Sequence, residues 1–277
     1  MTSQPPARSW LRSSATPVPW PGLRVVVCGS GVTGTAAARY LRDRGAAVDV
    51  VDSPPDAPAP EVGVPDLVVS SPGWPPHHPL LLAMADARVP IWSEVELAWR
   101  ATPPGTSWLA VTGTNGKTTT TEMLLAILLE AGCNAASAGN IGTPLIDVVS
   151  AAAPPEWLAV ELSSFQLHWP HTLQPLAATV LNVAADHLDW HGTPQSYAND
   201  KGTVYAVGTR AVYNADDRWS TQLARSSPDR VGFTTGTPAE DQYGVAGDTL
   251  VGPAGEPICA VSELSVVGDH NVANALA

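Results

Sequence analysis

The sequence is poor in positive charge and in cysteine. Among 277 residues, 14 are Lys or Arg and 26 are Asp or Glu, so the formal net charge is −12 at pH 7. Nucleic acid binding needs a basic surface, and this balance, without any basic run, argues against a nucleic acid partner. The three scattered cysteines include no C-x-x-C pair. They exclude a disulfide framework and suit a reducing, cytoplasmic location.

Long apolar runs are also lacking. No stretch approaches the roughly 18 uninterrupted apolar residues that a membrane-spanning helix requires. Residues 1–21 contain five prolines and no apolar core of a secretory signal. They predict a flexible N-terminal arm. A length of 277 residues with 44% hydrophobic side chains suits about two folded domains, and we expect a monomer with no membrane partner.

A glycine-rich stretch at residues 110–119, Ala-Val-Thr-Gly-Thr-Asn-Gly-Lys-Thr-Thr, is the most informative part of the chain. It joins the apolar run at 108–111, predicted as a buried strand, to a predicted helix over 118–130. Such a turn presents backbone N–H groups and the positive helix end to phosphate, while Lys117 can reach the outer phosphates and Thr118 can bind Mg²⁺. The stretch predicts an ATP site. Ordinary P-loop spacing would place a glycine at Val111, so a plain glycine turn stays open as the alternative.

A second nucleotide motif opens the first predicted domain, residues 22–103. A predicted strand leads into Gly29-Ser-Gly-Val-Thr-Gly34, then a helix, then a strand that ends at Asp52. In such an opening the glycines allow the turn and the approach of a pyrophosphate, and the carboxylate can hold a ribose hydroxyl. Alone, the motif favours an NAD-dependent oxidoreductase, but it specifies only a nucleotide, and a tight turn without ligand remains the alternative.

Further strands of this domain are predicted at 66–70 and 90–94. The first runs into Ser71-Pro-Gly73, and ligands bind where parallel strands end. The segment 101–107 is rich in Pro, Gly and Thr and predicts a linker, with the boundary near residue 104. The expected fold class is α/β, with a Rossmann-like N-terminal domain and a P-loop-type central domain, residues 104–277, around a mostly parallel sheet.

Glu161 and His187 lie at the ends of two predicted strands of the second domain. Glu161 ends an apolar strand, where a buried carboxylate is costly unless a cation such as Mg²⁺ faces it. A hydrogen-bonded capping role is the alternative. His187 follows another strand end beside Asp186 and Asp189. Both strand ends should open onto the edge that carries the phosphate loop, although a loop histidine is usually just solvated.

Five motifs in order resemble the Mur ligases of peptidoglycan synthesis over residues 22–277. They are Gly-Thr-Asn-Gly-Lys-Thr at 113–118, Gly-Asn-Ile-Gly at 139–142, Val-Glu-Leu-Ser-Ser-Phe-Gln-Leu at 160–167, Asn-Val-Ala-Ala-Asp-His-Leu-Asp at 182–189 and His-Asn-Val-Ala-Asn at 270–274. The short first domain is similar to that of the members that add D-glutamate. In this family the first domain holds a UDP-sugar, which the resemblance implies here in place of NAD.

The resemblance implies ATP-driven amide formation. The alanyl carboxylate of UDP-N-acetylmuramoyl-L-alanine takes the γ-phosphoryl group of ATP, and the amine of D-glutamate then displaces phosphate. Phosphoryl transfer is catalysed mainly by positioning and charge neutralisation, so metals and Lys117 should carry most of the effect. By the same resemblance Thr118 and Glu161 hold one Mg²⁺ and His187 a second. Lys201 is then carbamylated by CO₂, which turns a cation into an anionic metal ligand.

The resemblance also implies two sets of binding residues. Those for ATP are Gly113, Thr114, Asn115, Gly116, Lys117, Thr118, Thr119, Asn271 and Asn274. Those for the UDP-sugar are Val32, Thr33, Asp52, Ser53, Ser71, Gly73, Asn140 and Ser163. The catalytic set is Lys117, Glu161, His187 and Lys201.

The sequence departs from the family pattern in three places. A basic residue is expected near Ser53, and Trp74 stands where a smaller residue is usual. The chain stops at Ala277, about two turns into a helix predicted from His270. The third domain of the family, which closes over ATP, is therefore expected to be missing, and the fragment to bind nucleotides with little turnover. The alternatives are a sister ligase, including folylpolyglutamate synthetase, and a non-catalytic nucleotide-binding module.

Overall fold

The computed structural model describes residues 18–54, 58–266 and 268–277. The predicted N-terminal arm lies outside these ranges except for its last four residues. Of those, Trp20 is buried and packs edge-on against Tyr40 and Trp92. Packing in this part of the chain therefore includes a residue before residue 22, where the first domain was predicted to start.

The chain forms two compact units. The first contains the residues up to Pro103 and two later segments, Thr143–Pro154 and His168–Leu173. The second contains Pro104–Gly142, Pro155–Leu167 and Gln174–Ala277. The two later segments come from the range that the sequence analysis treats as one central domain.

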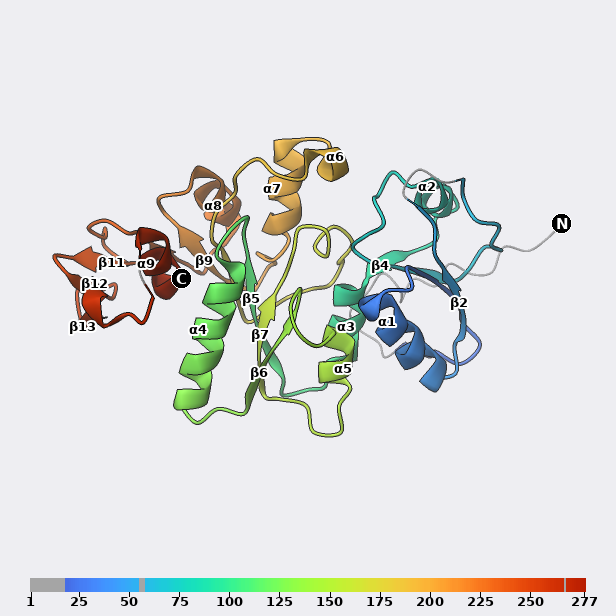
Figure 1. Cartoon of the computed structure of the whole chain (residues 1–277), viewed down its shortest axis with the longest axis horizontal. Coiled ribbons are helices and arrows are strands. Elements are labelled where there is room, and N and C mark those ends of the chain that lie inside the picture. Colours follow the sequence, from blue (N-terminus) through green and yellow to red (C-terminus); the bar gives the residue numbers. More distant parts are fainter. Residues whose placement is uncertain (1–17, 55–57, 267) are drawn as a thin grey trace. The chain divides into compact units, whose positions relative to one another are not determined.

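The first unit is built on a parallel sheet with the order β2-β1-β3-β4 (Figure 1). Its elements are β1 (Arg24–Cys28), α1 (Val32–Asp43), β2 (Ala47–Val51), β3 (Leu67–Ser70), α2 (Pro79–Asp86), β4 (Ile91–Ser93), α3 (Glu94–Ala101) and, from a later segment, α5 (Leu145–Val149). The strands alternate with helices because their apolar residues are buried on the sheet while the helices cover it. The predicted α/β class is confirmed.

Glu96 holds the segment His168–Leu173 in the first unit. Its buried carboxylate accepts hydrogen bonds from Arg100 Nε at 2.6 Å, from the backbone N–H groups of His171 and Thr172 at 2.8 and 2.9 Å, and from Thr172 Oγ1 at 2.7 Å. The Arg100 guanidinium lies over the Trp92 ring. A buried carboxylate is tolerated when it is paired and hydrogen-bonded in this way, so Glu96 is a structural anchor.

The second unit contains a larger sheet, in the order β13-β12-β11-β10-β9-β8-β5-β7-β6 over the described residues. Its strands are β5 (Ser107–Thr112), β6 (Ala135–Gly139), β7 (Trp157–Glu161), β8 (Ala177–Val180), β9 (Arg210–Asn214), β10 (Arg230–Phe233), β11 (Gln242–Ala246), β12 (Thr249–Val251) and β13 (Pro257–Ala260). Its helices are α4 (Lys117–Glu130), α6 (Leu188–His191), α7 (Pro194–Gly202), α8 (Arg218–Leu223) and α9 (Asp269–Leu276), with 3-10 turns at Ala224–Ser226 and Val261–Glu263.

Pairing is parallel from β6 through β11, as predicted, and antiparallel from β11 to β13. The antiparallel end was not predicted, although Gly247-Asp248 between two short apolar runs is a hairpin signal. The central strands β5, β7 and β8 are neighbours, so the loops that leave their carboxyl ends share one edge. In the described part of the chain no helix combines the length and apolar character needed to cross a membrane.

Candidate functional site

The glycine-rich loop joins β5 to α4 as the sequence predicts. Gly116 is the N-cap of α4 and has φ of 87°, in the left-handed region that favours glycine. A methyl group at Gly116 would overlap Oδ1 of Asn274, which lies on α9. Both the backbone conformation and this close approach therefore require glycine here. The first turn of α4 presents its backbone N–H groups to the loop, which is the geometry of a phosphate site.

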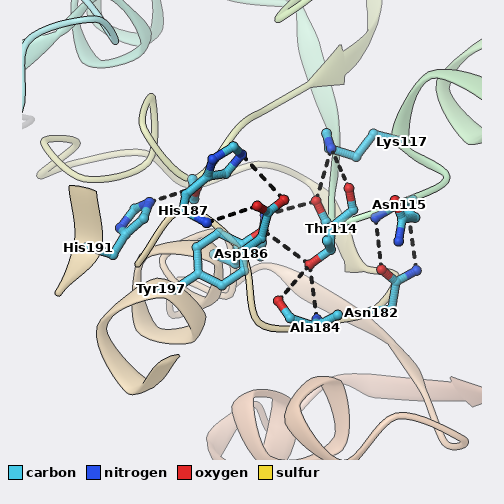
Figure 2. A network of polar contacts seen from close by, with 12 residues as sticks. Thr114, Asn115, Lys117, Asn182, Ala184, Asp186, His187, His191 and Tyr197 are labelled. Carbon is cyan, nitrogen blue, oxygen red and sulfur yellow. Dashed lines mark hydrogen bonds and ion pairs between the residues drawn. The ribbon is translucent and has the colours of Figure 1, made fainter. Parts of the chain in front are cut away.

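Two ammonium groups meet at this loop. Lys117 Nζ donates to the carbonyl oxygens of Gly113 and Thr114 at 3.1 and 3.0 Å, as Figure 2 shows for the labelled residues. Lys201 Nζ, on α7, donates to the Gly113 carbonyl at 2.8 Å. The two lysine side chains thus meet at the loop, at the point where an anion is predicted to bind.

Lys201 is unusual because its side chain is almost completely buried, at 1% exposed. Burial, and next the charge of Lys117, lower the pKa of Lys201 to about 7, while Asp186 and Asp200 oppose the shift. The ammonium also lies 4.5 Å from the ring centroid of Tyr197. A large fraction of Lys201 is therefore an uncharged, nucleophilic amine near neutral pH.

Glu161 forms the oxygen-rich side of the site. It is the last residue of β7, is 1% exposed, and accepts hydrogen bonds from Thr118 Oγ1 and Asn140 Nδ2, both at 2.8 Å. Carboxylate and hydroxyl oxygens suit Mg²⁺, which takes one or two carboxylates and fills its remaining positions with phosphate and water. The predicted pair of Mg²⁺ ligands is thus brought together. Across the described residues no three His, Cys, Asp or Glu side chains gather into a metal cluster.

Hydrogen bonds from the end of β8 fix the conformation of the phosphate loop. The amide of Asn182 accepts from Asn115 N at 2.9 Å and donates to the Asn115 carbonyl at 3.1 Å. Thr114 Oγ1 accepts from Ala184 N at 3.0 Å and lies 3.1 Å from the Tyr197 hydroxyl. Figure 2 shows these side chains converging on the loop. Thr114 and Asn115, predicted to contact ATP, are therefore also the points at which the loop is held.

His187 lies at the edge of this network. It has φ of 51°, its side chain is 47% exposed, and its Nε2 is 3.4 Å from Asp186 Oδ2. Its ring centroid lies 4.7 Å from that of Phe165. The second predicted metal ligand is therefore partly solvated and lies beside a carboxylate.

The remaining predicted residues of the second unit lie around the same edge. Asn274 is buried beside Gly116, and its Nδ2 donates to Asn271 Oδ1 at 3.1 Å. Ser163 takes part in a local turn, with its N–H and hydroxyl donating to Gln166 Oε1 at 3.0 and 3.1 Å. Thr119 follows in the first turn of α4 and is half-buried.

In the first unit the predicted nucleotide residues follow β1, β2 and β3. Asp52 accepts hydrogen bonds from the hydroxyl and the N–H of Ser30, and these bonds lower the pKa of Asp52. Ser71 N–H donates to the Cys28 carbonyl at 2.9 Å, which ties the loop after β3 to β1. Val32 is 74% exposed at the start of α1. Of the other three, Thr33 and Ser53 are half-buried and Gly73 is exposed.

Several residues of the site were not singled out from the sequence. They are Ser164, Asn182, His191, Tyr197 and Asp200. Each carries a buried or bridging polar group next to a predicted residue. One signal was available, because Tyr197 and Lys201 are four residues apart and so share a helix face.

Comparison with known proteins gives a family match. The family description "Mur ligase middle domain" matches residues 111–277. The UDP-N-acetylmuramoylalanine--D-glutamate ligase of Frankia casuarinae is 49% identical, over 95% of this chain and 61% of that protein. Its namesake in Streptomyces avermitilis is 44% identical, over 93% of this chain and 63% of that protein. The chain thus spans somewhat less than two thirds of the length of these relatives.

Solved structures agree in fold. The UDP-N-acetylmuramate:L-alanyl-gamma-D-glutamyl-meso-diaminopimelate ligase from Neisseria meningitides has a TM-score of 0.57 at 17% identity, covering 92% of this chain and 91% of that one. A pseudomurein peptide ligase type C from Methanothermus fervidus has a TM-score of 0.51 at 18% identity, covering 92% of this chain and 66% of that one. At such identities the likeness extends to the fold alone.

Proposed function

Because the chain belongs to the Mur ligase family, we propose that it serves the ATP-dependent joining of D-glutamate to UDP-N-acetylmuramoyl-L-alanine in peptidoglycan precursor synthesis. The names of the relatives at 44 and 49% identity support this choice of substrates. The observation that carries the proposal is the convergence of Lys117, Thr118, Glu161 and Lys201 on one phosphate loop. The Lys117 ammonium can neutralise the charge of a phosphoryl group directly, and Thr118, Glu161 and modified Lys201 would act by holding Mg²⁺ against it.

In this proposal residues 104–277 bind ATP. The loop residues Gly113 to Thr119, with the Lys117 ammonium, surround the phosphates, and Asn271 with Asn274 approaches the nucleoside end. Thr118 and Glu161 would hold one Mg²⁺, and His187 with a modified Lys201 a second. Bound Mg²⁺ supplies charge neutralisation on the phosphate oxygens. Asn140, which donates to Glu161, orients that carboxylate.

We place a carbamate on Lys201. The uncharged Nζ attacks the carbon of dissolved CO₂, an N–C bond forms, a C=O π bond opens onto oxygen, and the nitrogen releases a proton to water. The product is an N-carboxylate with one negative charge in place of the ammonium. The lowered pKa and the burial of Lys201 support this step, since the amine is already uncharged in much of the population near pH 7.

Residues 22–103 bind the UDP-sugar in this proposal. Asp52, held by Ser30, would accept from a ribose hydroxyl, with Val32 and Thr33 at the start of α1 facing the pyrophosphate. The other proposed contacts in the first unit are Ser53, Ser71 and Gly73.

The reaction proceeds through an acyl phosphate. The alanyl carboxylate attacks the γ-phosphorus and ADP leaves, after which the amine of D-glutamate attacks the acyl carbon and phosphate leaves. All three cysteines are free thiols, which suits a reducing cytoplasm as the place of this reaction.

The test is calorimetric titration of the chain with UDP-N-acetylmuramoyl-L-alanine and, separately, with AMP-PNP and Mg²⁺. Asp52→Ala should weaken only the first ligand and Lys117→Ala only the second, so each variant is the control for the other. NADH binding with no response to the UDP-sugar would overturn the assignment of the first unit. Equal loss of both ligands in either variant would show unfolding instead of a lost contact.

A further inference from the structure

His191 is a fully enclosed polar side chain near the proposed site. It ends α6, its side chain is 0% exposed, and both of its ring nitrogens have partners. Nδ1 lies 2.8 Å from Asp200 Oδ2 and Nε2 lies 2.9 Å from Ser164 Oγ. The imidazole ring stacks on the Phe165 ring, with 5.4 Å between the ring centroids and an interplanar angle of 13°, and the Tyr197 ring meets the imidazole edge-on. The imidazole is therefore fixed in position and in orientation.

The two partners of His191 come from different segments, and each segment carries one proposed metal ligand. Ser164 lies in the loop directly after β7, three residues beyond Glu161. Asp200 lies on α7 and immediately precedes Lys201. His191 thus bridges the segment that positions Glu161 and the helix that positions Lys201. With Nδ1–H donated to the carboxylate, Nε2 of the neutral ring accepts from the Ser164 hydroxyl.

The hydrogen bond from Lys201 to the phosphate loop depends on whether Lys201 is carbamylated, whereas the His191 bridge does not. The unmodified ammonium holds α7 to the phosphate loop through the Gly113 carbonyl. Carbamylation removes that positive charge and adds a carboxylate, so this link is altered when the ligand is formed. The contacts of His191 with Ser164 and of Tyr197 with Thr114 do not involve the modified atoms. They can hold α7 in place through the change.

We propose that His191 is a positioning residue that sets the separation of Glu161 and carbamylated Lys201 through its hydrogen bonds to Ser164 and Asp200. The inference rests on the proposed function, because it assigns the bridge to the metal site named there. Partners that orient ligands in this way typically change metal affinity by 10- to 100-fold when they are removed. The buried Ser164 hydroxyl serves the same role and is not exposed as a nucleophile.

The test uses His191→Asn and Ser164→Ala. Asparagine can reach Asp200 but not Ser164, so both variants remove the same hydrogen bond. The matched control is Thr209→Val, which removes an equally buried hydroxyl, bonded to the Pro175 carbonyl at 2.7 Å, at the opposite end of β9. Ser164→Ala changes little volume, so it gives an answer even where His191→Asn does not fold.

Two readouts separate positioning from general stability. The first is the carbamate signal in ¹³C NMR with labelled bicarbonate, assigned by its loss in Lys201→Ala. The second is the affinity for AMP-PNP with and without Mg²⁺. His191→Asn and Ser164→Ala should each weaken the affinity for AMP-PNP with Mg²⁺ about tenfold or more and lower the carbamate signal. Without Mg²⁺, the affinity of each should stay within about twofold of wild type. The double variant should be no weaker than the weaker single variant.

The outcomes are distinct. If the wild-type chain shows the carbamate and the Mg²⁺ effect while both variants match Thr209→Val, His191 is only structural and the inference is wrong. If the wild-type chain shows neither, the proposed metal site fails and the inference fails with it. A decrease shared by all three variants, with or without Mg²⁺, would also contradict positioning, since it would reflect stability alone.

Discussion

Lys117 and Lys201 donate to the same acceptor, the carbonyl oxygen of Gly113, over 3.1 and 2.8 Å. They are also the only two lysines in the sequence. One belongs to the phosphate loop and the other arrives from α7, so two like charges are held at one oxygen. Their repulsion contributes to the lowered pKa of Lys201. Conversion of one of them to an anion would turn this repulsion into attraction.

Lys201→Met should flatten the pH dependence of stability. Below pH 7 the amine is protonated in the folded and unfolded chain, so the cost of burying the charge is fully present. Between about 7 and the ordinary pKa near 10.4 the unfolded chain binds a proton that the folded chain has lost. The free energy of unfolding of wild type therefore rises with pH relative to the variant, by up to about 1.4 kcal/mol per pH unit.

The measurement is urea unfolding of both chains from pH 6 to 9.5 in CO₂-free buffer. The methionine variant should have its largest advantage at pH 6, and this advantage should shrink as the pH rises. A constant difference between the two chains would mean that Lys201 titrates normally.

Glu161→Gln should separate metal binding from nucleotide binding. The amide keeps the shape of the side chain and can still contact Thr118 and Asn140, but it lacks the charge that Mg²⁺ requires. We expect AMP-PNP affinity to fall about tenfold or more with Mg²⁺ and to change little without it, as measured by calorimetry. Glu122→Gln, at an exposed position on α4, should match wild type. An unchanged Mg²⁺ dependence would remove Glu161 from the metal site.

Gly116→Ala should abolish nucleotide binding and destabilise the chain. The left-handed φ of 87° costs alanine about 1 kcal/mol, and its methyl group also displaces Asn274. Gly132→Ala is the matched control at the other end of α4, because Gly132 has φ of 77° and open space around its Cα. It should lose a similar amount of stability from backbone strain, seen in urea unfolding, and keep its affinity for AMP-PNP. Equal affinities in the two variants would show that the loop tolerates the contact.

Glu96→Ala should destabilise the first unit by roughly 3–5 kcal/mol, because it removes a buried ion pair with Arg100 and the hydrogen bonds from His171 and Thr172. Asp229→Ala removes an exposed ion pair with Arg210 and should cost no more than about 1 kcal/mol. Thermal unfolding followed by circular dichroism compares them. Similar midpoints for the two variants would mean that Glu96 does not anchor the segment His168–Leu173.

The regular elements around the phosphate loop were predictable because their signals are local. The apolar run of β5, the glycines of the loop and the start of α4 are contiguous, and the observed bounds differ from the predicted ones by one residue. The proximity of Glu161 and Thr118 was predictable from topology, since Glu161 ends β7 and Thr118 lies in the first turn of α4, which follows the neighbouring strand β5. The strands β11 to β13 were missed because their runs are short and alternate weakly.

The enclosed position of His191 was not predictable. His187 and His191 lie in one loop and helix four residues apart, and sequence reasoning selected His187 by its motif. Burial distinguishes them, because His191 is enclosed and bonded at both nitrogens while His187 is half exposed. Burial depends on packing by Tyr197 from the next helix and by Ser164 and Phe165 from a loop distant in the sequence. No local pattern carries that information.

The chain passes between its two compact units repeatedly, after Pro103, Gly142, Pro154, Leu167 and Leu173. A single proteolytic cut after Pro103 would therefore not release either unit, since the second would still carry α5 and the Glu96-bound segment. Leu145, Ile146 and Val149 are buried in α5, which packs against α1 and α3 of the first unit, so residues 104–277 expressed alone would expose them to solvent. Recombination between homologous chains at the apparent linker would encounter the same problem. A unit of this protein therefore has to be exchanged together with the other unit, since each contains segments that the chain supplies between parts of the other.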